Sequence, residues 1–86
     1  MSKLHNLELN TEFAEAVLNG EKNFELRFND RGFQKGDRVK FTVINEGCVN
    51  PYHPLGKKTY VITYVINGWG LENGFVAFDI KEVSDE

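Results

Sequence analysis

Three charged residues that lie close together in the sequence have side chains suited to binding or proton transfer: Lys22, Glu25 and Arg27. Glu25 and Arg27 are two positions apart, so in a β-strand both side chains project from one face, and Lys22 stands just before that strand. Lysine and arginine donate hydrogen bonds to phosphates and to nucleobase edges, and a carboxylate can hold the arginine in place. The alternative is an ion pair that only orients the strand, because exposed pairs contribute about 0–1 kcal/mol.

Two further side chains are candidates for ligand contact. Arg31 follows the charged cluster by four residues and could close over a ligand bound there. Trp69 stands between two glycines in an expected loop, where it either caps the core or stacks on a base. Tyr52 and His53 support the same argument for stacking more weakly.

Other chemistries have little support in the sequence. Cys48 and His53 could be drawn as a nucleophile and its base, but they share a proline-containing loop and no third group orients them. The two histidines, His5 and His53, lack the spacing of a metal site, and no phosphate-binding glycine motif is present. We therefore predict neither a metal nor a cofactor.

The element that must position the charged cluster is a strand over residues 23–28, which follows Gly20. Its apolar residues alternate with polar ones, and we expect the apolar set to face the core and the polar set to face outward. The apolar set is Phe24, Leu26 and Phe28, and the polar set is Asn23, Glu25, Arg27 and Asn29.

The remaining pattern predicts a mainly β fold with one helix. A helix is expected over Thr11–Asn19, beginning after Asn10 as N-cap and closed by Gly20. Asn45–Lys57 has no periodicity and reads as a long loop, and the β-branched run of Thr59–Ile66 reads as a central strand covered on both faces. Further strands are expected over Leu4–Leu9, Arg38–Ile44 and Phe75–Val83. Five strands and a short N-terminal helix predict an α+β fold built on a small barrel or strongly curled sheet.

Length and charge bound the possible partners. The chain has 86 residues, a formal net charge of −3 and 41% apolar residues, which predicts a single domain over residues 1–86 with its own core. Residues 20–40 contain six Lys and Arg against four Asp and Glu, so positive charge is local and predicts a site rather than a broad nucleic-acid surface. A single cysteine, with no signal-peptide or membrane-spanning pattern, predicts a cytoplasmic protein without membrane contact. Oligomeric state is not predicted.

The spacing Gly20-x-Lys22-x-x-Glu25-x-Arg27 resembles the G-x-K-x-x-E-x-R signature of the ASCH family, whose domains adopt a PUA-like β-barrel. The flanking Asn29-Asp30-Arg31 and the turn from Phe33 to Asp37 are similar to a small bacterial and phage branch of that family. The resemblance spans nearly the whole chain in the same element order.

This resemblance implies a cleft beside the barrel that binds RNA or a nucleotide-like ligand, with Lys22, Glu25 and Arg27 on its wall. One relative of this type is an amidohydrolase acting on acetylated cytidine, and it uses the signature lysine with a threonine where this chain has Glu25. Glu25 has no attacking hydroxyl, so we expect binding of RNA or a nucleoside-like ligand by Lys22, Glu25, Arg27, Arg31 and Trp69. The alternative is a small hydrolase of a modified nucleoside in which Lys22 and Glu25 move protons.

Overall fold

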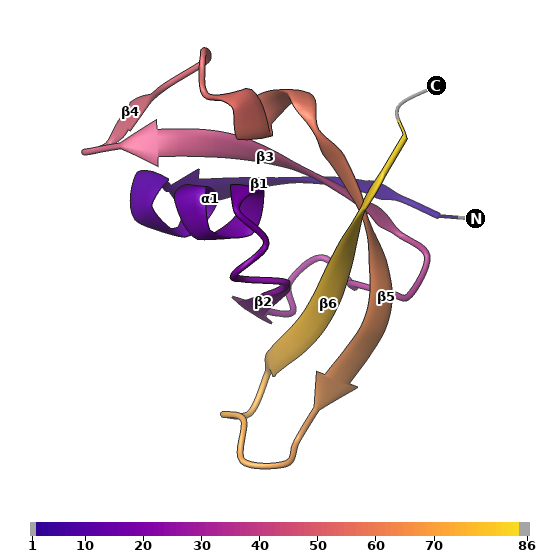
Figure 1. The fold of residues 1–86 in the computed structure, drawn as a ribbon. Helices are drawn as coiled ribbons and strands as arrows, with labels where there is room; N and C mark the ends of the chain where they lie inside the picture. Colours follow the sequence, from indigo (N-terminus) through magenta and orange to yellow (C-terminus); the bar gives the residue numbers. More distant parts are fainter. Residues whose placement is uncertain (1, 85–86) are drawn as a thin grey trace.

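The architecture is an open half-barrel formed by one curled sheet, with a helix packed at one end (Figure 1). The computed structural model describes residues 2–84. In chain order its elements are β1 (Leu4–Asn10), α1 (Thr11–Leu18), β2 (Phe24–Phe28), β3 (Arg38–Asn45), β4 (Cys48–Val49), the 3-10 helix η1 (Pro54–Lys57), β5 (Thr59–Asn67) and β6 (Phe75–Val83). The α+β prediction is confirmed at this level.

The strand order in the sheet is β1-β3-β5-β6-β2, with β4 paired to β3 beside this path. β1 and β3 are parallel, whereas the other pairs are antiparallel. β3 and β5 pair over only two positions, Arg38 with Val61 and Val39 with Tyr60, so the sheet bends sharply there. This bend separates the β1–β3 half from the β5–β6–β2 half and brings the two ends of the sheet, β1 and β2, toward each other.

The core lies on the concave side of the sheet and under α1. The strands predicted over Leu4–Leu9 and Arg38–Ile44 are confirmed as β1 and β3, and each buries alternate side chains: Leu7, Leu9, Val39, Phe41 and Val43. The other buried apolar side chains come from the helix, the turn before β3, η1, β5 and β6: Ala14, Val17, Phe33, Leu55, Tyr60, Ile62, Val76, Phe78 and Ile80.

The helix α1 begins and ends close to the predicted positions. Asn10 occupies the N-cap position with extended backbone, but its side chain makes no capping hydrogen bond. Instead, Thr11 Oγ1 donates to the carbonyl of Ile44 at 3.1 Å and ties the helix start to β3. Asn19 is the C-cap, and Gly20 has φ +80°, the left-handed conformation that favours glycine after a helix.

Two loop and strand predictions are wrong in part. The segment 45–57 is not structureless: Glu46 and Gly47 both have positive φ and form a two-residue hairpin turn into β4, after which η1 follows. β5 is covered on both faces only near its start, because a register shift between Ile62 and Tyr64 precedes its solvent-exposed end, where Tyr64 is 62% exposed.

Within residues 2–84, no helix combines the length and apolar character needed to span a bilayer.

Candidate functional site

A groove with a volume of about 650 Å³ lies between the two end strands of the sheet. We call it the seam groove. Its lining comes from β1, α1, β2, β3 and the turn before β2: Glu8, Leu9, Asn10, Phe13, Lys22, Phe24, Glu25, Leu26, Arg27 and Ile44. Three of the five side chains expected to bind a ligand, Lys22, Glu25 and Arg27, therefore line one cavity.

Glu25 is the buried centre of the charged cluster, with 2% of its surface exposed. Its Oε2 lies 2.5 Å from Lys22 Nζ, and its Oε1 accepts from Arg27 Nε at 2.9 Å. Burying a carboxylate costs several kcal/mol unless cations and hydrogen bonds compensate it, and here each oxygen has a cationic donor. Glu25 therefore pairs with both cations, whereas the sequence predicted a pairing with Arg27 alone.

The sidedness predicted for the strand that holds the cluster is wrong. Glu25 points inward, whereas Phe24, Leu26 and Phe28 point outward and are 49%, 53% and 56% exposed. The two-residue period is correct, but the face assignment is reversed. The physical reason is the position of β2 at the end of the sheet. There its inner face lies against the groove and carries an ion-pair network instead of apolar packing.

The seam is formed by unpaired edges of β1 and β2. At the two ends of β2, Asn23 O accepts from Ile80 N of β6 and Asn29 N donates to Gly74 O just before β6. By alternation, the N–H and C=O of Leu26 point away from β6. On β1, Lys3 O accepts from Arg38 N, so the carbonyls of Asn6 and Glu8 point away from β3 by the same alternation.

Arginine side chains bridge the seam. Arg27 Nη2 donates to Glu8 O at 2.8 Å, and Arg31 Nη1 donates to Asn6 O at 2.8 Å. Lys3 Nζ in turn donates to Arg31 O at 3.2 Å. These bonds satisfy carbonyls that an open sheet leaves unpaired, so Arg27 and Arg31 contribute to holding the half-barrel together.

Lys22 connects the charged cluster to the aromatic rim of the groove. Its ammonium donates to Phe24 O at 2.6 Å and lies 4.9 Å from the Phe24 ring centroid and 6.0 Å from that of Phe13. Phe13 and Phe24 are 43% and 49% exposed. The groove thus presents aromatic surface beside positive charge. The sequence pattern did not identify the two rings, because the alternation assigned Phe24 to the core and Phe13 lies within the expected helix.

The other two predicted ligand residues, Arg31 and Trp69, do not line the seam groove. Arg31 sits farther along the seam, and its Nε is 3.9 Å from Asp30 Oδ1. Trp69 is 90% exposed with φ +54°, so the alternative that it caps the core is wrong.

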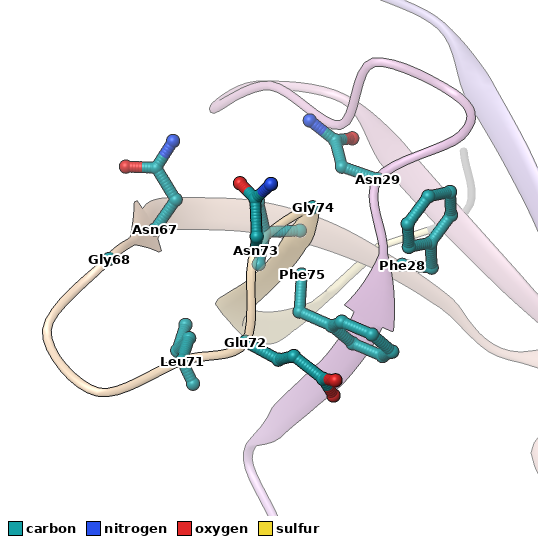
Figure 2. A pocket seen from close by; sticks show the side chains of 10 residues that line it. Phe28, Asn29, Asn67, Gly68, Leu71, Glu72, Asn73, Gly74 and Phe75 are labelled. Atoms are coloured by element: carbon teal, nitrogen blue, oxygen red, sulfur yellow. The ribbon is translucent and has the colours of Figure 1, made fainter.

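A second cavity, of about 550 Å³, lies where the β5–β6 loop meets the end of β2, and we call it the loop pocket (Figure 2). Asn67 and Asn73 project from the β5 end and the loop, and Asn29 faces them from the segment after β2. Asn29 Oδ1 accepts from Phe33 N at 2.9 Å, which leaves its amide nitrogen for other partners. The Gly- and Asn-rich sequence of this loop signalled a turn but not a cavity.

Both histidines are paired with carboxylates away from the groove. His53 Nε2 lies 2.7 Å from Glu15 Oε2, so His53 links the loop to α1 and is not a base for the exposed Cys48. His5 Nε2 lies 2.8 Å from Asp37 Oδ2 in the core. Within the part of the chain that the structure describes, no group of three or more His, Cys, Asp or Glu could hold a metal ion.

Asp37 anchors β1 to the turn before β3. Burial raises the pKa of this carboxyl, but hydrogen bonds from His5 and from the backbone N–H groups of Lys3 and Gln34 outweigh it and hold the pKa below 3.8. The His5–Asp37 pair therefore has a structural role, joining β1 to the turn before β3.

Fold and site together define a small α+β domain with an aromatic-rimmed groove between its two end strands, which contains the Lys22, Glu25 and Arg27 cluster. The chain belongs to the family described as Domain of unknown function (DUF3850), whose family model matches residues 4–80. Among solved structures, the crystal structure of the hypothetical protein PH0355 is similar, with a TM-score of 0.60 and 19% identity over 94% of this chain and 99% of that chain. This likeness supports the fold alone. The comparison with curated proteins found no match.

Proposed function

We propose that this domain binds RNA or a nucleotide-like ligand in the seam groove. The observation that carries the proposal is the arrangement of Lys22 and Arg27, both held by the buried carboxylate of Glu25, at a groove rimmed by Phe13 and Phe24. Aromatic rings stack on nucleobases, and held cations contact phosphates or base acceptors. The resemblance of the signature to ASCH domains with a PUA-like fold supports the same ligand class, and such a ligand is expected in the cytoplasm.

Each cation keeps capacity for a ligand. The Nη1 of Arg27 enters none of the hydrogen bonds made by residues 2–84, and the Arg27 side chain is 25% exposed. The Lys22 ammonium has three donors and uses two of them. The N–H and C=O of Leu26, at the unpaired edge of β2, add one donor and one acceptor beside the groove.

The test is a binding titration that separates ligand contact from seam closure. Fluorescein-labelled single-stranded RNA is titrated with wild type and with Phe24→Ala, Arg27→Ala and Lys22→Ala, and unfolding of each variant is followed by circular dichroism. Phe24→Ala removes only a half-exposed ring, so we expect weaker binding with unchanged folding, by about fivefold or more for a lost stacking contact. Arg38→Ala, which removes an exposed cation outside the groove, is the charge-matched control. If Phe24→Ala, Arg27→Ala and Lys22→Ala all bind the RNA as tightly as wild type does, the groove is not the binding site.

A second candidate, hydrolysis of an acylated nucleoside, is favoured by one observation. Lys22 Nζ contacts a carboxylate that water barely reaches, and such a pair can transfer a proton. Release of the acyl group from acylated nucleosides is compared between wild type and Lys22→Ala. Equal background rates for the two proteins would remove this candidate.

A further inference from the structure

We propose that the ligand is a single-stranded oligonucleotide, not a free nucleoside, and that it runs along β2 from the seam groove to a second base-binding subsite in the loop pocket. This inference rests on the proposed function, because it assigns the length of the ligand that the seam groove binds. It uses features that the seam groove leaves unexplained: the outward apolar face of β2, the exposed Trp69 and the loop pocket.

The two cavities share one strand. Phe24 and Leu26 line the seam groove, whereas Phe28 and Asn29 line the loop pocket. β2 has five residues and is therefore about 16 Å long, which exceeds one nucleoside. The exposed side chains of Phe24, Leu26 and Phe28 connect the two cavities as one apolar strip, and outward aromatic side chains on a sheet are a usual platform for successive bases.

Positive charge follows the same direction on the other side of β2. Lys22, Arg27 and Arg31 succeed one another along the seam, and Lys3 bonds to the backbone of Arg31. A strand of nucleic acid lying along this edge would place its phosphates over the cations and its bases over the apolar strip. An apolar protein partner would not require this parallel row of cations, so the charge pattern favours nucleic acid.

The loop pocket has groups suited to one base. The side-chain amides of Asn67 and Asn73 form no hydrogen bonds among the described residues, and Asn29 offers its amide nitrogen (Figure 2). Carboxamides provide paired donors and acceptors that match base edges, and Phe28 supplies an aromatic wall. Gly74 lets that wall form, because a Cβ there would lie 2.6 Å from Phe28 Cε1. Trp69 stands next to Gly68, which lines the pocket, with its ring exposed for a further base.

The experiment compares ligand length and uses Trp69 as its own reporter, since it is the only tryptophan. A nucleoside monophosphate and a single-stranded RNA hexamer of the same base are titrated into wild type, Trp69→Ala and the double variant Asn67→Ala/Asn73→Ala. Tyr64→Ala, which removes a 62% exposed aromatic outside both cavities, is the matched control. Trp69 fluorescence is recorded where Trp69 is present, hexamer binding is followed by anisotropy and monophosphate binding by isothermal titration calorimetry, and circular dichroism verifies that each variant is folded.

We expect the hexamer to bind at least about tenfold more tightly than the monophosphate and to quench Trp69. Both loop variants should lose most of this gain while binding the monophosphate like wild type, and Tyr64→Ala should change nothing. Equal affinity for the two ligands, or a hexamer gain that survives both loop variants, overturns the oligonucleotide inference but leaves the seam groove proposal in place. If wild type binds neither ligand, the proposed function itself fails.

Discussion

Replacing Glu25 by alanine removes the carboxylate that Lys22 and Arg27 share in the seam groove. Both cations then lose a charge-assisted hydrogen bond, at 2.5 and 2.9 Å, and the emptied position is 2% exposed. Two such bonds contribute about 1.5–3 kcal/mol each. The Lys22 and Arg27 side chains keep 18% and 25% exposure and can turn toward water, so we expect a net loss of about 2–4 kcal/mol in the free energy of unfolding.

The assay is urea unfolding followed by far-ultraviolet circular dichroism, because the exposed Trp69 reports poorly on the core. Glu25→Gln keeps the shape and one acceptor, and we expect it to lose roughly half as much stability as Glu25→Ala. Glu82→Ala breaks the Lys58–Glu82 pair, whose side chains are 33% and 52% exposed, and should cost less than about 1 kcal/mol. If Glu25→Ala unfolds within about 0.5 kcal/mol of wild type, Glu25 does not hold the cluster together and the reasoning is refuted.

Three further predictions concern the His5–Asp37 pair, the glycines of the loop pocket and stability at alkaline pH. The pKa of Asp37 is lowered on folding, so its stabilising effect is present above pH 3.8 and is lost as the pH falls further. Asp37→Asn should therefore make the free energy of unfolding depend less on pH between about pH 4 and 2. An unchanged pH dependence in that range would contradict this. Gly74→Ala should destabilise more than Gly68→Ala in thermal unfolding, because both glycines have positive φ but only a Cβ at 74 meets the Phe28 ring, and equal losses would refute that contact. Burial and the negative charge of Glu82 raise the pKa of Tyr60, so stability present below pH 10 should fall above it, and Tyr60→Phe should reduce that fall when unfolding is measured from pH 9 to 11.

The sequence predicted most elements because their patterns reflect local rules. The alternation of Val39, Phe41 and Val43 is typical of a strand with one buried face, and Gly20 after an amphipathic segment is typical of a helix end. The small β4 hairpin was missed because Glu46-Gly47 is a weaker turn signal than Asn-Gly, although its backbone uses positive φ at both positions.

Three residues of the candidate site were predicted from the sequence, but their orientation was not. The spacing of Lys22, Glu25 and Arg27 identified a cluster that the structure brings together in one groove. The period of two cannot say which face of a strand is buried; that requires the rule that apolar residues face inward, and the rule fails on β2. It fails because β2 ends the sheet, where its inner face meets carbonyls of β1 that need donors.

The seam itself has no signal in the sequence. The hydrogen bonds from Arg27 to Glu8 O and from Arg31 to Asn6 O join positions 19 and 25 residues apart, and only the curvature of the sheet brings them together. The two cavities depend on the same curvature. Local propensity therefore specifies the strands, whereas the long-range closure that makes the groove becomes visible only in the folded chain.

The central claim is that the seam groove binds a nucleotide-like ligand, and a two-dimensional ¹H–¹⁵N NMR titration with single-stranded RNA tests it most directly. We predict that the largest shifts fall on the Leu26 amide and on the Arg27 Nε–H, with smaller shifts at Phe24 and Lys22. Shifts confined to residues outside the groove, or no shifts at saturating RNA, would contradict the claim.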